Sequence, residues 1–329
     1  MRRIFPAPSA PATDPWSDVP IVPEALRVVV VHWNQPDRCV ETVRRLVRDR
    51  VPVRVTVVDN GSTPPNRQRL EDALDGEHAV EVVSAGRNAG FGPGANVGLL
   101  RFLDRPDDGE WVGLCPHDVG FAEDCLERLL QSVTSVSAAG LACADVGDGM
   151  VPVIDPYFGG LTVPARRWRP GDGDPVAGEG WEDVAYPHGT FMLLRRGCIE
   201  EIGVFDERYF SYCEEADLAV RARRAGWQVG LVRGARVTNL HLGSSVPLVD
   251  YLQTRNTILF VRELSGRYHA AVRTVISVVQ AVLGTIWPSR RPLVFDARAR
   301  WRGVVDALRG RYGPPPADLG APQAVTTSS

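Results

Sequence analysis

Short runs of β-branched residues alternate with amphipathic helical segments along the first 140 residues of the chain. The first run, RVVVVHWN at 27–34, has the composition of a parallel strand that is buried on both faces. The next segment places Val40, Val43 and Leu46 on one helical face and arginines on the other. Further strands are expected in VRVTVVDNGS, at 80–84 and at 110–118. This alternation predicts an α/β fold: an open, mostly parallel, Rossmann-like sheet with helices on both faces.

Polar residues follow the predicted strands at the points where these end. Asn34, Asp59, the loop at 87–96 and Asp118 each come directly after a strand. In open α/β sheets, ligands bind beyond the carboxyl ends of the strands. We therefore expect these four segments to meet around one ligand.

Composition excludes several classes of protein. The 37 basic and 40 acidic residues give a net charge of -3, which argues against a nucleic-acid partner. Every basic residue is arginine, and the absence of lysine excludes phosphate-loop NTPases, protein kinases and Schiff-base enzymes. The six cysteines form no C-x-x-C pair, which argues against a zinc ribbon or a thioredoxin motif. Most of them lie in apolar runs, which favours a reduced, cytoplasmic protein.

Both ends of the chain differ from its centre. Residues 1–25 and 313–329 are rich in proline and alanine and are expected to be disordered. The apolar segment at 274–287 has 14 residues, too few to cross a bilayer. We expect it to be a buried helix, with a partner interface or a membrane-surface helix as alternatives.

The segments after the strands carry residues with several interpretations. Asp59 either caps a turn or accepts a hydrogen bond from a ligand N–H group. The glycines at 86–98 could approach a phosphate, but their G-x-G-x-x-x-G spacing differs from the dinucleotide-binding motif. Asp118, next to His117, could bind a divalent cation together with His241. The acidic group Glu214, Glu215 and Asp217 either stabilises a helix N-terminus or supplies a general base beside Tyr209, Phe210 and Tyr212.

Taken in order, these motifs resemble the inverting glycosyltransferases of family 2, which have the GT-A fold. The similar motifs are HWN, VVDNGS, NAGFGPGANVG, CPHD, GTFMLLRR, FDERYFSYCEEADL and VTNLHLGSS, and YLQTRN at 251–256 is also similar. The resemblance covers residues 27–262 and is strongest to bacterial rhamnosyltransferase-like and galactofuranosyltransferase-like members. It implies a nucleotide-sugar-binding half at 26–143, an acceptor and catalytic half at 144–245, and a C-terminal helical region at 246–312.

The resemblance also implies a role for each site residue. Those expected to bind the nucleotide-sugar are His32, Trp33, Asn34, Asp59, Asn88, Gly90, Asn96, His117 and Arg255. Gly189, Thr190, Phe191 and Tyr212 would line the acceptor side. Asp118 and His241 would bind Mg²⁺ or Mn²⁺. Glu215 would act as the catalytic base, with Glu214 as the alternative and Asp217 nearby.

This sequence departs from the family pattern at two functional positions. Glu215 stands where the family usually has the shorter Asp, so Glu214 is the alternative base. The family's metal motif is of the D-x-D type, and Pro116 stands where its first Asp could be. Asp118, which matches the last acid of the motif, is therefore the only acid of the motif that this chain retains.

The implied reaction is an inverting transfer from a nucleoside-diphosphate-sugar, such as dTDP-rhamnose or a UDP-sugar, to an acceptor hydroxyl. The acceptor could be a glycan, a lipid-linked glycan or a natural product. Two further interpretations remain open: an NAD(P)-dependent Rossmann oxidoreductase and a non-catalytic sugar-nucleotide-binding module. Two further partners stay open: a membrane surface in peripheral contact, and a second copy of this chain bound through the C-terminal helices.

Overall fold

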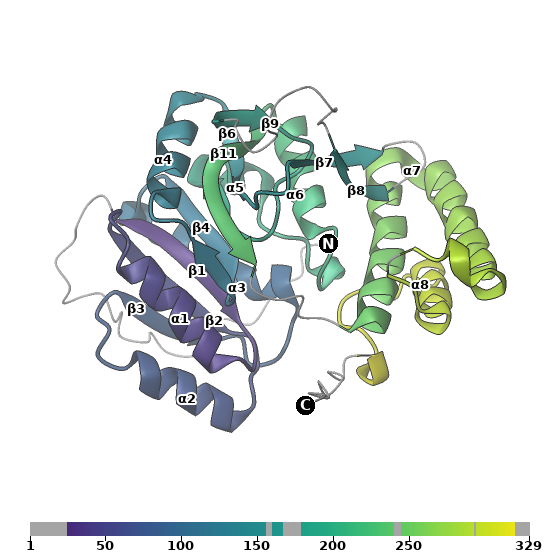
Figure 1. Ribbon diagram of the computed structural model, residues 1–329, viewed down its shortest axis with the longest axis horizontal. Coiled ribbons are helices and arrows are strands. Elements are labelled where there is room, and N and C mark those ends of the chain that lie inside the picture. The colour runs from purple at the N-terminus through teal and green to yellow at the C-terminus, as the bar shows by residue number, and fades with distance from the viewer. Residues whose placement is uncertain (1–24, 156–159, 167–178, 240–244, 293, 320–329) are drawn as a thin grey trace, which may run out of the picture.

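The computed structural model describes residues 25–155, 160–166, 179–239, 245–292 and 294–319. Within these residues, a nine-stranded sheet has the order β3-β2-β1-β4-β10-β6-β11-β5, and β9 pairs with β11 (Figure 1). A separate hairpin pairs β7 with β8. The strands are β1 (Leu26–His32), β2 (Val53–Asp59), β3 (Val80–Ser84), β4 (Trp111–Pro116), β5 (Val119–Phe121), β6 (Ala139–Asp145), β7 (Met150–Asp155), β8 (Gly160–Arg166), β9 (Gly180–Asp183), β10 (Met192–Arg195) and β11 (Gln228–Asn239).

The sheet is mixed. Strands β3, β2, β1 and β4 are mutually parallel, as the sequence predicts. Strand β10 is antiparallel to both of its neighbours, β4 and β6. The longest strand, β11, is parallel to β6 and antiparallel to β5 and β9. The first four strands therefore form a Rossmann-like half, and the reversed β10 joins it to the rest of the sheet.

Eight α-helices accompany the strands within the described residues. They are α1 (Pro36–Val47), α2 (Pro64–Leu74), α3 (Phe91–Leu103), α4 (Cys125–Ser135), α5 (Arg196–Ile202), α6 (Glu214–Arg224), α7 (Val246–Ile286) and α8 (Ala297–Leu308).

Strand β1 is buried on both faces. Val28 and Val30 belong to the apolar core that contains Val43 of α1 and Leu129 of α4. The alternate residues Val29 and Val31 belong to a second core, with residues of α3, α5 and α6. Because successive side chains of a strand point to opposite faces, an all-valine run suits a sheet that is covered on both sides. Helices on both faces are thus confirmed.

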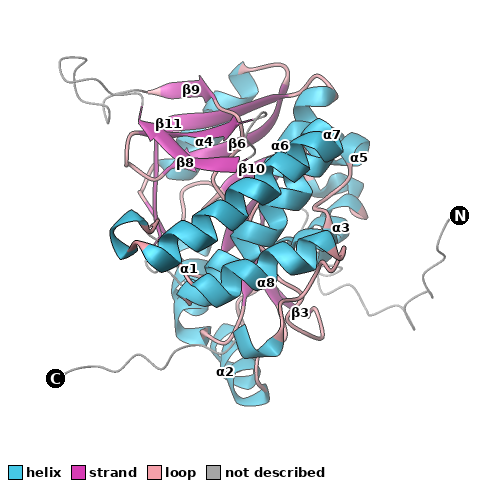
Figure 2. Cartoon of the chain, turned by 90° about the vertical axis from the view of Figure 1, so that its right-hand side faces the viewer, coloured by secondary structure: helices cyan, strands magenta, loops and turns pink. Residues whose placement is uncertain are grey.

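The C-terminal helices form a separate layer beside the sheet, at the right of Figure 1 and in front of it in Figure 2. Gly266, with φ 87° and ψ 179°, interrupts α7 and divides it into two helical halves. Helix α8 packs along α7, and the ring of Phe295, which precedes α8, lies against Gly284 of α7. By length and composition alone, α7 could cross a membrane, and only 22% of its most apolar window is buried. The expectation that 274–287 is a buried helix is therefore wrong, because Val275, Val279 and Ile286 are exposed.

Two features differ from the boundaries expected from the sequence. The expected boundary between residues 143 and 144 falls inside β6, whose neighbours β10 and β11 come from the second half of the chain. Both halves therefore share one sheet. Residues 317–319, expected in a disordered tail, form a short 3-10 helix in which Asp318 pairs with Arg302 at 2.6 Å.

Candidate active site

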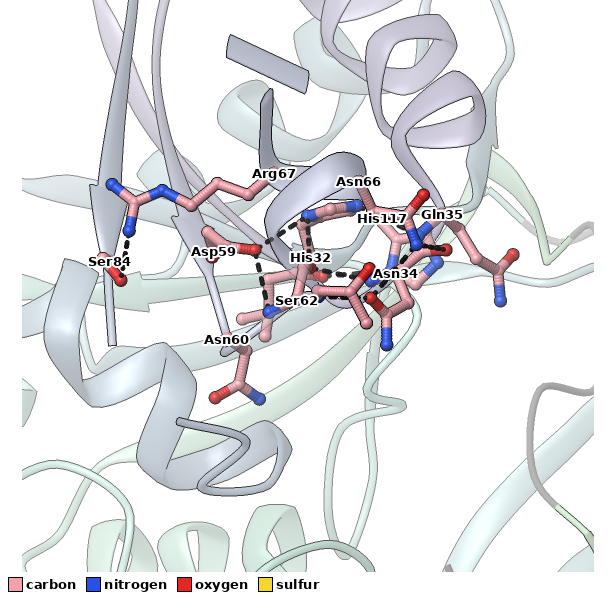
Figure 3. A network of polar contacts seen from close by, with 12 residues as sticks. His32, Asn34, Gln35, Asp59, Asn60, Ser62, Asn66, Arg67, Ser84 and His117 are labelled. Atoms are coloured by element: carbon pink, nitrogen blue, oxygen red, sulfur yellow. Dashed lines mark hydrogen bonds and ion pairs between the residues drawn. The ribbon is translucent and has the colours of Figure 1, made fainter. Parts of the chain in front are cut away.

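The ends of β1 and β2 meet through a histidine and a carboxylate. His32 and Asp59 are register partners, and His32 Nδ1 lies 3.4 Å from Asp59 Oδ1 (Figure 3). The backbone N–H of Gln35 donates to His32 Nε2 at 3.1 Å. Because Nε2 accepts this bond, the ring proton belongs on Nδ1, facing Asp59.

Asp59 is held in its ionised form. The side chain is 1% exposed, and burial alone would favour the neutral acid. Hydrogen bonds from His32 and Ser62 outweigh this burial and keep the pKa of Asp59 below its usual value. The end of β2 therefore presents a negatively charged hydrogen-bond acceptor at neutral pH.

Asn34 ties the loops after β1 and β2 together. Its backbone has a φ of 55°, and its N–H donates to Ser62 Oγ at 2.9 Å. Its side-chain Oδ1 accepts from the Thr63 N–H at 2.8 Å and from Asn66 Nδ2 at 3.2 Å. Trp33, half-buried, stands between this residue and His32. These contacts fix the rim of the site on the β1 and β2 side.

The glycine-rich loop joins this rim to the segment before α6. Asn60 Nδ2 donates to the Gly90 carbonyl at 2.9 Å, and Asn88 Oδ1 accepts from the Gly90 N–H at 3.1 Å. Gly90 has a φ of 100°, and a β-carbon there would collide with the carbonyl of Phe210. Only glycine therefore permits this close approach. Asn96 exchanges two hydrogen bonds with the backbone of Phe205, at 2.9 and 3.0 Å.

These two bonds engage both ends of the Asn96 amide, and its side chain is 3% exposed. The structure thus places Asn96 as a clamp between α3 and the loop that leads to α6. It was expected to contact the nucleotide directly.

The turn after β4 carries His117 and Asp118. Thr42 of α1 holds this turn, because its hydroxyl donates to the His117 carbonyl at 2.9 Å and accepts from the Val119 N–H at 3.2 Å. The rings of His117 and His32 stand edge to face with centroids 5.5 Å apart. Burial lowers the pKa of His117 to about 4. His117 is therefore neutral at physiological pH, and its buried Nε2 has no hydrogen-bond partner.

The donor set for a divalent cation is small. The described residues contain no group of three or more His, Cys, Asp or Glu side chains that could hold a metal ion. Asp118 is 8% exposed, and His241 lies outside the described residues. The last residue of β11, Asn239, is the register partner of Val119, which follows Asp118 in the sequence. The end of β11 therefore lies beside the turn that carries Asp118. Among the described residues, the Asp118 carboxylate supplies one oxygen ligand of the kind a hard cation prefers, so phosphate and water would have to supply most of the others.

Glu215 stands at the start of α6 against the segment before β10. A β-carbon on Gly189 would collide with Glu215 Oε1, so the carboxyl group lies directly over this glycine. Its neighbour Glu214 is 1% exposed, and Glu214 Oε2 has no hydrogen-bond partner. The two predicted base candidates are thus distinct, since Glu214 is enclosed and Glu215 faces the predicted acceptor side.

The loop before α6 is conformationally strained. Among the described residues, the only non-glycine residues with positive φ are Asn34, Phe210, Tyr212 and Cys213. Asn256 of α7 supports this loop, because its side-chain amide donates to the Ser211 and Tyr212 carbonyls at 2.8 and 2.9 Å. Such conformations cost about 1–3 kcal/mol each and persist where surrounding contacts impose them. The first half of α7 thus fixes the orientation of the α6 N-terminus.

Burial raises the pKa of both glutamates, and the effect is larger for Glu214. The pKa of Glu214 is raised first by burial and then by the negative charge of Glu215. The pKa of Glu215 is raised by burial, while a hydrogen bond from Glu214 opposes this shift. Because Glu214 is the more enclosed of the two, burial disfavours its ionised form more strongly than that of Glu215.

Several predicted residues lie in structural positions. Asp217 pairs with Arg221 at 2.8 Å, one turn further along α6. Phe191 is fully buried and packs edge to face on Phe121 at 5.1 Å. Arg255 of α7 is 1% exposed and donates to Asn256 Oδ1 at 3.0 Å and to the Tyr251 hydroxyl at 3.3 Å. Thr190 and Tyr212 are half-buried beside Gly189 and the strained loop.

Three supporting residues were not predicted from the sequence, namely Ser62, Thr42 and Asn256. Ser62 lies inside the VVDNGS motif, where a hydroxyl next to Asn-Gly was a usable signal. Asn256 ends the YLQTRN segment at 251–256, whose similarity to the family was a usable signal. Thr42 acts from α1, and no local pattern marks it.

One surface cavity lies away from these residues. It has a volume of about 660 Å³ and is lined by α1 and the turn after β5, including Arg44, Arg45 and Phe121. None of the predicted site residues lines it. This cavity is therefore not part of the candidate site.

Comparisons with known proteins identify the class of protein to which this chain belongs. The Glycosyltransferase like family 2 pattern matches residues 23–273. The chain belongs to this family and is a glycosyltransferase. Membership rules out the oxidoreductase interpretation, whose glycine spacing was already unfavourable.

Two characterised relatives are similar in sequence. N-acetylglucosaminyl-diphospho-decaprenol L-rhamnosyltransferase of Mycobacterium tuberculosis is 26% identical over 210 residues, which is 56% of this chain and 66% of that protein. The low-salt glycan biosynthesis hexosyltransferase Agl10 of Haloferax volcanii is 25% identical over 175 residues, 53% of this chain and 54% of that protein. The chain thus spans less than two thirds of each relative.

Two solved structures share the fold. The mannosyltransferase PcManGT of Pyrobaculum calidifontis, in complex with GDP-Man and Mn²⁺, has a TM-score of 0.55 at 13% identity, covering 91% of this chain and 90% of that one. GalNAc-T7 with UDP, GalNAc and Mn²⁺ has a TM-score of 0.58 at 13% identity, covering 87% and 54%. The predicted GT-A fold is confirmed.

Proposed function

We propose that this glycosyltransferase moves a sugar from a nucleoside-diphosphate-sugar to an acceptor hydroxyl with inversion at the anomeric carbon. The observation that carries the proposal is the position of Glu215. Its carboxyl group lies against Gly189, behind a strained loop that α7 supports. A carboxylate in that position can take the proton of an attacking hydroxyl.

Glu214 and Glu215 are proposed to have different roles in proton transfer. Glu214 is enclosed, and burial raises its pKa, so it is proposed to stay neutral and to donate a hydrogen bond that favours the ionised form of Glu215. Glu215 then removes the acceptor proton while the hydroxyl oxygen attacks the sugar opposite the leaving diphosphate. The bond to the diphosphate breaks through an oxocarbenium-like state, as in glycoside hydrolysis.

The donor is proposed to bind across the ends of β1, β2 and β4. Asp59, ionised and beside His32, is suited to accept the N–H of a pyrimidine base. Trp33, Asn34, Asn88 and Gly90 form the surrounding rim. The sugar is proposed to be a deoxyhexose carried on dTDP, with UDP-sugars second, because the mycobacterial relative is named as an L-rhamnosyltransferase.

Asp118 and His241 are proposed to hold Mg²⁺ or Mn²⁺. A bound divalent cation would supply positive charge at the diphosphate as the leaving group departs. The Mn²⁺ complexes of the two similar structures support this proposal. Without lysine, this chain can otherwise offset that charge only with arginines and backbone N–H groups.

The acceptor is proposed to be a glycan hydroxyl, and a lipid-linked glycan is favoured by the name of the mycobacterial relative. The reaction is proposed to occur in the cytoplasm, because all six cysteines are buried and unpaired.

A thermal-shift screen with dTDP, UDP and GDP in the presence of Mn²⁺ tests the donor assignment. We expect dTDP or UDP to raise the melting temperature and GDP to leave it unchanged. Stabilisation by GDP alone would contradict the pyrimidine assignment.

A further inference from the structure

The second half of α7 carries a stripe of exposed apolar side chains. Eleven large hydrophobic residues are exposed among the described residues, and nine of them lie between Tyr268 and Leu308. Five of them follow one face of α7 at spacings of seven, four, three and four residues: Tyr268, Val275, Val279, Val282 and Ile286. Trp287 comes directly after Ile286 and is also exposed. This face of the helix points away from its packing partners.

A second stripe lies on α8. Trp301, Val305 and Leu308 are exposed at spacings of four and three. The buried side of α8 packs on the first half of α7, since a β-carbon on Gly303 would meet the Tyr251 carbonyl. Val278, in the second half of α7, packs on Ile258 of the first half and on Val304 of α8. Both stripes therefore face away from the first half of α7, in the layer that fronts Figure 2.

Positive charge accompanies the apolar side chains. Residues 246–319 contain eleven arginines and five acidic residues, a net charge of +6 in a chain whose total is -3. Arg267 lies beside the α7 stripe, and Arg298 and Arg309 lie beside the α8 stripe. All three are exposed, and no ion pair neutralises them within the described part of the chain.

We propose that the exposed face formed by both stripes, here called the apolar-arginine face, binds the surface of an anionic bilayer. Apolar side chains flanked by arginine and tryptophan are typical of helices that lie in the headgroup region. A second copy of this chain would bring two net-positive faces together, whereas acidic lipid headgroups complement them. The bilayer is thus the occupant that the charge favours.

The helices are proposed to lie on the membrane without crossing it. Gln280 accepts a hydrogen bond from Arg300 at 2.9 Å, and Gly284 packs on Phe295. A spanning position would break these contacts between α7 and α8. Asn256, in the first half of α7, also supports the loop before α6, so membrane contact would hold the candidate site near the bilayer surface.

Vesicle flotation with the full chain tests this inference, without donor, acceptor or metal. Phosphatidylcholine vesicles are compared with vesicles of phosphatidylcholine mixed with phosphatidylglycerol. We expect binding to the mixed vesicles, weakened by added salt. Because no catalytic component is present, failure here is distinct from failure of the proposed transfer reaction.

Two pairs of matched variants identify the face. The double variant Val279→Ser with Ile286→Ser should bind about tenfold or more weakly. Its control, Leu100→Ser with Val246→Ser, removes equally exposed side chains elsewhere and should bind like the native chain. Arg298→Gln with Arg309→Gln should weaken binding about 25-fold, from about fivefold per arginine. Its control is Arg44→Gln with Arg48→Gln on α1.

Three results would overturn the inference. The native chain could fail to float with the mixed vesicles. The Val279 and Ile286 variant could bind as tightly as its control. The native chain could instead form a dimer in solution that this variant abolishes, with no vesicle binding, which would identify a second copy as the occupant.

Discussion

The carboxyl group of Glu215 lies over the α-carbon of Gly189, in space that any β-carbon at that position would occupy. Gly189→Ala must therefore displace the carboxyl group. We expect kcat to fall about a hundredfold, because displacement of a reacting group by about 1 Å costs that much. Donor affinity, measured by calorimetry, should be unchanged. Gly197→Ala is the control, because its β-carbon would make an ordinary 3.8 Å contact with Trp227.

Asp59 is predicted to contribute to donor affinity. Asp59→Asn removes the charge that His32 and Ser62 stabilise, and a hydrogen bond to a charged group contributes about 1.5–3 kcal/mol. We expect the Kd for the donor nucleotide to rise about tenfold to a hundredfold. Asp37→Asn, on an exposed carboxylate of α1, should leave the Kd unchanged. Equal affinities of the two variants would remove Asp59 from the donor site.

Transfer should require a divalent cation held by Asp118. EDTA should abolish activity, and Mn²⁺ or Mg²⁺ should restore it. Asp118→Asn should raise the Mn²⁺ concentration needed for half-maximal activity by about tenfold or more, since an amide oxygen carries no charge. Full activity in EDTA would contradict this assignment.

Stability should fall as the pH falls through the range set by His117. Burial holds the pKa of this histidine at about 4 in the fold, below its usual value of 6.5. Between these values the unfolded chain binds the proton and the folded chain does not, so acid favours unfolding. His117→Asn should reduce the loss of unfolding free energy between about pH 7 and about pH 5, measured in urea. His78→Asn, at an exposed position, should not.

Much of the donor half could be predicted because its signals are local. The valines of β1 alternate between two cores, and Asp59 and Asn34 follow strands that are adjacent in the sheet. Parallel strands place their carboxyl ends at one edge, so strand order alone brings these residues together.

The catalytic half depends on contacts between distant parts of the chain. The reversed β10 enters the sheet between β4 and β6, which carries Gly189 to the start of α6. No periodicity in the sequence specifies this insertion. Likewise, nothing in the sequence indicates that Arg255 is buried and bonded to Tyr251 and Asn256 within α7.

Side-by-side transfer assays of Glu215→Gln and Glu214→Gln test the central proposal most directly. We predict that Glu215→Gln lowers kcat by about a hundredfold to ten-thousandfold with donor binding retained, because it removes the base. Glu214→Gln should keep most of the activity, since glutamine is neutral and can still donate to Glu215. Unchanged turnover of Glu215→Gln, or loss of turnover only in Glu214→Gln, would contradict the assignment of Glu215 as the base.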